Sequence, residues 1–292
     1  MVRLYSEIMT EKSFVHLHNH SEFSFIDGSS LLDSMASICD NLGMPAIALT
    51  DHGNMYGAVD FYNACKTKNI KPIIGCEFYI APKNRFDKDP SYSYDHLTVI
   101  AKNNLGYSNL IKLVSRGNLE GFYYRPRIDK EILKEHSEGL IVLSGCPSAE
   151  LFKKIVSGDE KSITDTISWY KEVFGDDYYL EIMRHENVDN QEKVNQWIIN
   201  NYKQLNIKIV ATNDNHYETK GDYEKEVLLK NVRSGSSNPR SDILEDNSYY
   251  IMGPEEMREK FKDIPEACDN TLEIADKCNV KIDFSKTMIP DF

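Results

Sequence analysis

The stretch Phe14-Val-His-Leu-His-Asn-His20 places three histidines at alternate positions of an apolar run. Successive side chains of a β-strand point to opposite faces, so a strand here directs all three imidazoles to one side. A second apolar run, Ile209-Val-Ala-Thr-Asn-Asp-Asn-His216, ends with Asp214 and His216 in a similar arrangement. The two runs therefore predict two strands, far apart in the chain, that offer the same metal-binding chemistry.

The composition is that of a chain with a large hydrophobic core. The 292 residues are 41% hydrophobic and 27% charged, and this length fits one α/β barrel or two smaller domains. No run approaches the roughly 18 apolar residues of a membrane span, and the first residues lack the pattern of a secretion signal. The six cysteines form no CxxC pair, which favours reduced thiols. These features predict a cytoplasmic protein without membrane contact.

The net charge of −12 restricts how the chain can bind nucleic acid. A protein that coats nucleic acid neutralises phosphates with Lys and Arg, which this surface cannot do over a large area. Bound divalent cations supply a positive field at one place, so phosphoester chemistry stays open. The charge therefore excludes general coating but not a local site for an anionic substrate.

Apolar, β-rich segments alternate along the chain with segments of helical period, which is the pattern of parallel strands joined by crossover helices. We expect seven strands, at Val15–His18, Ala46–Thr50, Pro72–Tyr79, His96–Ala101, Leu140–Ser144, Tyr178–Met183 and Lys208–Thr212. Helices are expected at Leu31–Leu42, Gly57–Lys68, Gly106–Leu119, Ser148–Val156, Lys161–Phe174 and Gln191–Leu205. From about Gly221 the alternation stops, and another helix is expected around Ile264–Cys278. The pattern predicts an α/β fold, either a barrel or a wound sheet.

In a βα barrel the functional residues gather at the carboxyl ends of the strands. Four predicted strands are followed or ended by residues that bind metals: His18 and His20, Asp51 and His52, Cys146, and Asp214 and His216. Glu77 lies inside an apolar run, where an uncompensated carboxylate is costly. His96 precedes its apolar run. It therefore reaches the carboxyl end of the parallel strands only if an antiparallel hairpin follows Tyr79. Asp27 follows soon after His20.

A single histidine in a barrel is more often a hydrogen-bonded core or surface residue than a metal ligand. The joint pattern is more specific, because imidazole with carboxylate suits zinc, manganese or iron, and one thiolate favours zinc. His16 is expected deeper in the barrel, where it supports the ligands or fills the core, and Asp51 is expected to support a ligand. His136 and His185 lie in polar contexts and are expected at the surface.

The polymerase and histidinol phosphatase (PHP) superfamily has motifs that closely resemble five in this chain: His18-Asn-His20, Thr50-Asp-His52, Gly75-Cys-Glu77, Ser144-Gly-Cys146 and Asn213-Asp-Asn-His216. Longer strings resemble the amino-terminal PHP domain of bacterial DNA polymerase III alpha subunits. Among them are Leu49-Thr-Asp-His-Gly-Asn-Met-Tyr-Gly57 and Gly121-Phe-Tyr-Tyr-Arg-Pro-Arg-Ile-Asp129. The resemblance covers essentially the whole chain.

This resemblance implies a distorted, TIM-like barrel of seven strands over residues 1–220. A mainly helical C-terminal extension, residues 221–292, is then expected to pack on the barrel and to lead to a polymerase palm outside this chain. The resemblance also implies up to three divalent metal ions, with zinc or manganese favoured and iron as an alternative. By residue-wise match, one ion takes His18, His20, Glu77 and Asp214, a second shares Glu77 and takes His96 and Cys146, and a third takes Asp27, His52 and His216.

The activity implied by the resemblance is phosphoester hydrolysis by a metal-activated water, without a protein nucleophile. For a polymerase the natural substrate is a mispaired 3′ end of DNA, which predicts a 3′–5′ proofreading exonuclease in a parent DNA-directed DNA polymerase. Arg125 and Arg127 lie among aromatic residues and either clamp a phosphate or form structural contacts. Two alternatives remain, a small-molecule phosphatase of the histidinol phosphate type and a catalytically silent structural module of the polymerase.

Overall fold

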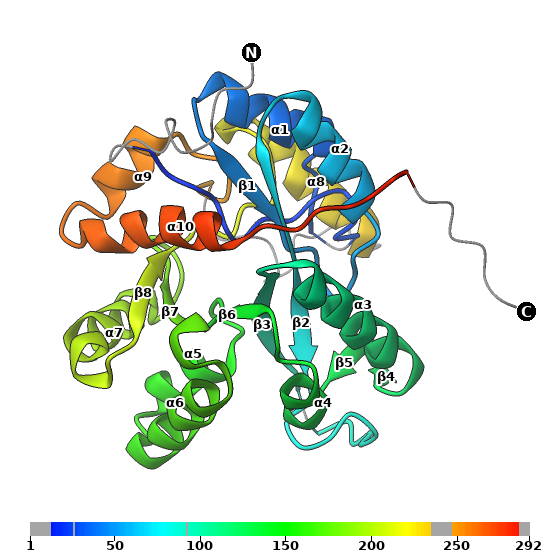
Figure 1. Ribbon diagram of the computed structural model, residues 1–292. Helices are drawn as coiled ribbons and strands as arrows, with labels where there is room; N and C mark the ends of the chain where they lie inside the picture. Colours follow the sequence, from blue (N-terminus) through cyan, green and yellow to red (C-terminus); the bar gives the residue numbers. More distant parts are fainter. Residues whose placement is uncertain (1–12, 26, 92, 235–246, 286–292) are drawn as a thin grey trace, which may run out of the picture.

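A mixed β-sheet runs through the centre of the molecule, and helices cover its outside (Figure 1). The computed structural model describes residues 13–25, 27–91, 93–234 and 247–285. The strands are β1 (Ala46–Leu49), β2 (Lys71–Ile80), β3 (Asp95–Ala101), β4 (Phe122–Tyr123), β5 (Arg125–Ile128), β6 (Leu140–Leu143), β7 (Tyr178–Ile182) and β8 (Lys208–Ala211). They are hydrogen-bonded in the order β4-β5-β2-β3-β6-β7-β8, and β1 pairs in parallel with β2.

The extended segment 13–20 closes this sheet between β1 and β8. On one side, the Ala48 N–H donates to the His16 carbonyl at 2.9 Å. On the other side, the Asn215 N–H, just beyond β8, donates to the His18 carbonyl at 3.1 Å. Isolated parallel bridges connect the segment to both neighbours, so it takes the place of the first predicted strand. With this segment, β1, β2, β3, β6, β7 and β8 make the seven strands of the predicted distorted barrel, which is confirmed, while the short β4 and β5 form a hairpin beside β2.

The three histidines of this segment do not face one side, contrary to the expectation from their alternate spacing. Val15 and Leu17 belong to a buried cluster with residues of β1, β2, β6 and β8, whereas His16 Nε2 lies 2.8 Å from the Met252 carbonyl. The chain bends at His18, which breaks the regular alternation of a strand. His18 and His20 therefore share one side, and their ring centroids lie 5.3 Å apart.

Strand β3 runs antiparallel to both of its neighbours, β2 and β6. Its register with β2 places His96 opposite Tyr79 and Thr98 opposite Glu77. The start of β3 therefore lies at the end of the barrel where the parallel strands finish. This confirms the antiparallel hairpin that the position of His96 required.

The helices that the sequence predicted are present, with shifts of a few residues at their ends. They are α1 (Leu32–Asn41), α2 (Ala58–Thr67), α3 (Asn104–Leu119), α5 (Glu150–Ser157), α6 (Glu160–Phe174), α7 (Gln191–Leu205) and α10 (Pro265–Lys277). The sequence pattern did not predict α4 (Lys130–Glu135), α8 (Tyr223–Ser234), α9 (Pro254–Lys260) or the short strands β4 and β5. Most of these elements are too short to show a hydrophobic period. Within the described ranges, no helix has the length and apolar character that crossing a membrane requires.

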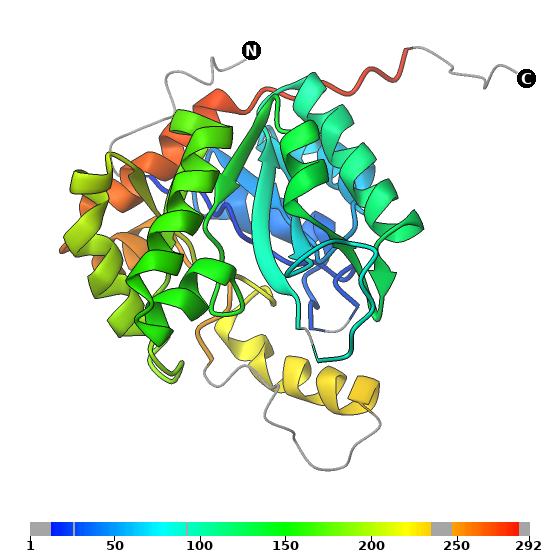
Figure 2. The same cartoon turned by 90° about the horizontal axis from the view of Figure 1, so that it is seen from below.

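The chain after residue 220 packs closely on the barrel. On α10, the Asn270 side chain donates to the Ile209 carbonyl of β8 at 2.7 Å, and the Thr271 hydroxyl accepts from the Val15 N–H at 3.1 Å. Met257 of α9 and Phe261, the residue after this helix, are fully buried in the main hydrophobic cluster. Figure 2 shows that α8 and the loop between β2 and β3 extend from the same end of the barrel. Residues 235–246 and 286–292 of the predicted extension lie outside the described residues, and the division at residue 220 stays a prediction.

Asn19 joins the closing segment to both of its neighbours. Its buried amide donates to the Ala48 carbonyl at 2.8 Å and to the His16 carbonyl at 3.0 Å. Its side-chain oxygen accepts from the Asn215 side chain at 2.6 Å. The side chain thus adds three hydrogen bonds to the backbone pairing that closes the barrel.

We expect Asn19→Ala to lower the free energy of unfolding by about 2–4 kcal/mol, because it leaves buried polar groups without partners. Urea unfolding followed by circular dichroism measures this loss. Asn118→Ala is the control, since that exposed side chain bonds only within α3, to the Val114 carbonyl, and its loss should cost less than about 0.5 kcal/mol. Equal losses in the two variants would contradict the role of Asn19 in closure.

Candidate metal centre

The predicted ligands meet at the carboxyl end of the parallel strands, around the Glu77 carboxylate. Glu77 lies in the second half of β2 and is only 1% exposed. Its two oxygens contact atoms of five other predicted ligands: His52 Nδ1 at 2.6 Å, His96 Nδ1 at 3.0 Å, His18 Nε2 at 3.3 Å, Cys146 Sγ at 3.4 Å and His20 Nε2 at 3.6 Å. One buried carboxylate therefore connects ligands from four other strand ends.

The first predicted set of ligands is compact. Asp214 Oδ1 lies 3.1 Å from His20 Nε2 and 3.3 Å from His18 Nε2. One ligand atom from each of these three residues lies within 4.8 Å of the others. With Glu77 beside both histidines, two carboxylates and two imidazoles surround one small volume, which suits a divalent transition-metal ion.

The two other predicted sets are adjacent. Around Glu77, Cys146 Sγ lies 3.6 Å from His96 Nδ1. In the remaining set, Asp27 Oδ1 lies 3.1 Å from His52 Nε2, and Asp27 Oδ2 lies 3.9 Å from His216 Nε2. All nine predicted ligands thus lie in one cluster, and the assignment of each residue to a particular ion stays a prediction.

Several buried polar atoms of this cluster have close neighbours but no hydrogen bond. They are His18 Nε2, Asp27 Oδ1, His52 Nδ1 and Glu77 Oε2. Buried polar groups are normally hydrogen-bonded, because an unpaired group loses the stabilisation that water gave it. Ligand atoms that converge on a cation have this arrangement, since each aims its lone pair at the ion rather than at its neighbour. The residues present therefore fit a metal centre.

The electrostatics of the centre differ from one ligand to another. Burial alone would raise the pKa of the Glu77 carboxyl, but His96, His52 and His18 lower it well below its usual range. Burial, together with other histidines of the cluster, lowers the pKa of His20 to about 3. The Glu77 carboxylate is therefore ionised and the His20 imidazole neutral near pH 7. Burial alone would lower the pKa of His18 and of His52, but the neighbouring carboxylates raise both well above the usual value, so a cation would displace a proton from these two rings.

Local backbone conformations aim two of the ligands. Asp214 has a φ of 48°, a left-handed conformation that costs most residues energy and that Asp and Asn tolerate best. Gly145 has a φ of 93° directly before Cys146, and a Cβ there would lie 2.7 Å from the Ala149 Cβ. These tight turns bring Asp214 and Cys146 back toward Glu77 immediately after their strands end.

The two residues expected to support the ligands have different roles. The Asp51 carboxylate accepts hydrogen bonds from the Ser21 N–H and the Ser24 hydroxyl, both at 2.7 Å, and Ser24 Oγ lies 3.1 Å from His20 Nδ1. Asp51 thus supports His20 through one serine. His16 lies away from the cluster, where burial lowers its pKa to about 4 and its ring bridges Met252 and Asn215.

The two predicted phosphate-binding arginines differ in their surroundings. Arg127 is buried, and its guanidinium donates to the backbone carbonyls of Gly121 at 3.1 Å and Asp87 at 2.6 Å, which favours the structural alternative. Arg125 is half-buried, and its guanidinium carbon lies 5.8 Å from the centre of the Tyr79 ring. That ring lies 5.9 Å from the His52 ring, so Arg125 is one side chain away from the cluster.

Two residues were not identified correctly from the sequence. His185, expected at the surface, is 4% exposed and stacks on Tyr249 with a ring separation of 3.8 Å. Glu181 of β7 was not singled out, yet its carboxylate lies 2.9 Å from His18 Nδ1. The available signal was a carboxylate inside the apolar strand Tyr178–Ile182, the same signal that marked Glu77.

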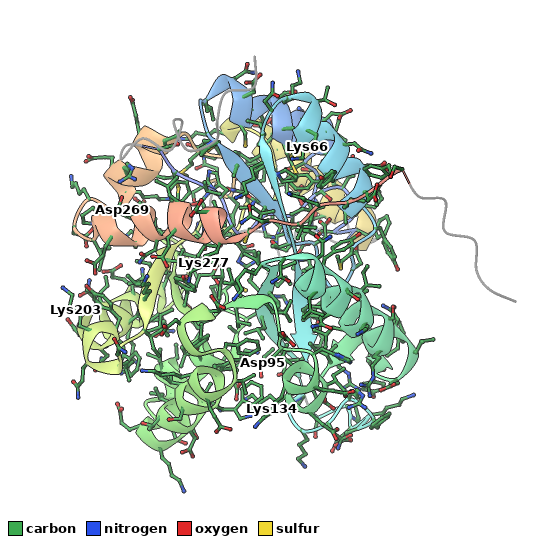
Figure 3. The ribbon with its side chains drawn as sticks, in the orientation of Figure 1. Lys66, Asp95, Lys134, Lys203, Asp269 and Lys277 are labelled. Carbon is green, nitrogen blue, oxygen red and sulfur yellow. The ribbon has the colours of Figure 1, made fainter. Side chains whose placement is uncertain are left out.

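A cavity of about 760 Å³ lies away from this cluster, at the amino ends of β7 and β8. Lys203 and Lys277, marked in Figure 3, line it together with Lys208 and Glu273. Its charges are largely paired, since Lys277 lies 3.3 Å from Glu273 and Lys208 also pairs with Glu273. The cavity therefore does not extend the candidate metal centre.

Comparison with known proteins identifies relatives over nearly the whole chain. A family model described as the PHP domain matches residues 16–185. The DNA polymerase III subunit alpha of Chlamydia pneumoniae is 40% identical over 312 residues, covering 95% of this chain and 25% of that protein. The subunit of the same name from Borreliella burgdorferi is 42% identical over 286 residues, covering 96% of this chain and 25% of that protein. The chain thus spans about a quarter of the length of these relatives.

A solved structure from Bifidobacterium adolescentis, described as a metal-dependent phosphoesterase, aligns with a TM-score of 0.47. It is 13% identical in sequence, and the alignment covers 92% of this chain and 97% of that chain.

We expect Glu77→Gln to lower the metal content by about one ion or more per chain, because a carboxamide is a poor bridge between cations. Plasma mass spectrometry after loading with zinc or manganese and gel filtration measures the content. Glu150→Gln is the matched control, since that half-buried carboxylate pairs with Lys130 and Lys154 away from the cluster. Unchanged metal content in Glu77→Gln would contradict the assignment.

Proposed function

The chain belongs to the PHP domain family, and we propose that it acts as a metal-dependent 3′–5′ exonuclease within a DNA polymerase III alpha subunit. The observation that carries the proposal is the complete set of nine predicted ligands gathered around Glu77. A silent structural module would have no need to keep every one of these costly buried charges. The relatives of this chain are polymerase subunits, which favours a DNA end over a small phosphate ester as substrate.

The ligands would hold up to three divalent ions, with zinc or manganese as the proposed metals. Such ions, when bound, polarise a phosphoryl oxygen and make water a nucleophile near neutral pH. The residues of this chain fix where that chemistry takes place. The side chains of Asp27 and His96 are 23% and 14% exposed, whereas His18 is fully buried. The substrate phosphate is therefore expected to approach from the side of Asp27 and His96.

Aromatic side chains beside this entrance suit a nucleic acid strand. The Tyr79 ring packs edge-on against Tyr94 and His96, with centroids 4.8 and 5.2 Å away. Tyr124, at the turn between β4 and β5, is 76% exposed and holds a left-handed φ of 58°. An exposed ring next to Arg125 offers base stacking together with phosphate binding, which is how proteins bind single strands.

The partners proposed for the chain are a DNA 3′ end and the remaining parts of a polymerase. Because the chain spans about a quarter of its relatives, a polymerase palm would be supplied by sequence outside it. Residues 221–292 are the proposed junction to that part, and residues 1–220 the proposed PHP barrel. A replicative role also implies action in the cytoplasm.

We expect Asp214→Asn to reduce hydrolysis by roughly 100-fold or more, because loss of a ligand removes several kcal/mol of transition-state stabilisation. Asn tolerates the left-handed backbone at this position, so the fold should be kept. Release of nucleotides from 3′-labelled single-stranded and mispaired-primer DNA, with manganese or zinc, measures the activity. Asp269→Asn, on α10 in Figure 3, is the control and should retain full activity.

The same assay separates the alternatives. Phosphate released from histidinol phosphate alone would indicate a small-molecule phosphatase. Absence of hydrolysis on both substrates, with metal bound, would favour a structural module. Activity that survives chelator or Asp214→Asn would contradict the proposed centre.

We expect Arg125→Ala to raise the KM for DNA about 10-fold with little change in kcat, since a charged hydrogen bond contributes about 1.5–3 kcal/mol. Steady-state kinetics on single-stranded DNA at fixed ionic strength measure both constants. Arg116→Ala is the control, because that arginine of α3 pairs with Glu120, just after the same helix, and with Glu135 of α4. A KM that does not rise in Arg125→Ala would exclude phosphate binding by this residue.

A further inference from the structure

Glu181 is a second buried carboxylate beside the metal centre, and it was not among the predicted ligands. It lies in β7 and is 3% exposed. Its Oε1 lies 2.9 Å from His18 Nδ1, while the other ring nitrogen of His18 faces Glu77 and Asp214. Glu181 therefore contacts the far side of a ligand rather than the space between the ligands.

The same carboxylate connects the turns that carry two other ligands. The Thr212 hydroxyl, two residues before Asp214, donates to Glu181 Oε1 at 2.6 Å. The Gly145 N–H, directly before Cys146, donates to Glu181 Oε2 at 2.8 Å. Each donor belongs to a different strand end, so Glu181 ties three parts of the centre to β7.

The hydrogen bonds of Glu181 determine which nitrogen of His18 carries a hydrogen. Both oxygens of Glu181 already accept a hydrogen bond, from Thr212 and Gly145, so Glu181 is the acceptor and His18 Nδ1 the donor. With the hydrogen on Nδ1, Nε2 is the nitrogen left to bind a cation, and Nε2 is one of the buried atoms without a hydrogen bond. Among the residues that the structure describes, His18 is also the only basic group within ion-pair distance of Glu181. The carboxylate thus serves His18 rather than a lysine or an arginine.

We propose that Glu181 is a positioning residue of the metal centre. By accepting the Nδ1 hydrogen of His18 it holds the ring in one tautomer and orientation and directs Nε2 toward the ion. The inference rests on the proposed function for the existence of the centre, and it adds a residue that acts through His18 without touching metal or substrate. Removal of such a supporting carboxylate typically weakens metal binding 10- to 100-fold.

A merely structural role would give a different result. Glu181 could support the turns at Gly145 and Thr212 without any effect through His18. In that case its removal would weaken metal binding by the same factor whether or not His18 is present. A double-mutant cycle separates the two cases, because residues that act through one another give non-additive effects.

The experiment measures Co²⁺ affinity of the full chain from its visible absorption, for Glu181→Gln, His18→Ala and the double variant. We expect Glu181→Gln to weaken binding about 10- to 100-fold in the presence of His18 and to add less than about twofold in the His18→Ala background. The cobalt spectrum of Glu181→Gln should also change, since the ring of one ligand turns. An equal loss in both backgrounds, or no loss with His18 present, would overturn the proposal.

The matched control is Glu273→Gln, whose carboxylate accepts from the Tyr179 hydroxyl of the same strand at 3.0 Å, far from the ligands. Its Co²⁺ affinity should stay within about twofold of the unchanged chain. A loss as large as that of Glu181→Gln would overturn the proposal, since general loosening of β7 would then explain both.

A measurement on the unchanged chain covers the case in which Glu181→Gln does not fold. In the zinc-loaded protein, ¹⁵N NMR of the histidine rings should show His18 with its hydrogen on Nδ1 and the metal on Nε2. The opposite tautomer would overturn the proposal. These readouts report metal binding, so coupling between Glu181 and His18 without DNA hydrolysis would refute the proposed function and leave the inference standing.

Discussion

Backbone pairing of segment 13–20 between β1 and the turn after β8 is the constraint on which the rest of the structure depends. Buried N–H and C=O groups must find partners, and here the partners of one short segment lie on two strands from opposite ends of the fold. The pairing closes the barrel and sets His18 and His20 against Asp214. Because strand register has a period of two, a slip by one residue would turn these histidines away from Glu77.

The Glu77 carboxylate shows how charge and packing are balanced inside this barrel. A carboxylate that is 1% exposed loses nearly all of its hydration, a cost of several kcal/mol unless other groups compensate. Five ligand side chains from four other strand ends provide that compensation, and bound cations would add to it. Glu181 is compensated differently, by three ordinary hydrogen bonds, and it stands behind a ligand, whereas Glu77 faces the space between the ligands.

Most of the centre could be predicted from the sequence, because ligands at strand ends and carboxylates in apolar runs are local signals. Glu77 and the hairpin that returns His96 were identified in this way. The side on which His16 lies could not be, since a single bend at His18 reverses the expected alternation. The role of Arg127, phosphate binding or structural contacts, could not be decided from the sequence for another reason. Its acceptors, such as the Asp87 carbonyl, belong to a loop, and a loop has no periodic pattern from which its course could be predicted. The elements β4, β5 and α4 were not predicted because they are too short to show a hydrophobic period.

The closing segment also determines when the centre can form. His20 and Asp214 are 194 residues apart along the chain, and their contact has to wait for almost the entire barrel to be synthesised. Contacts of such high sequence separation form late and slow the folding of the chain. The conformational entropy of the long intervening segment is lost before these contacts can stabilise the fold. During translation, β1 and β2 with their helices can pair as soon as they leave the ribosome. Metal binding by the proposed centre would therefore be a late step of folding, because it requires the amino-terminal segment to be in place.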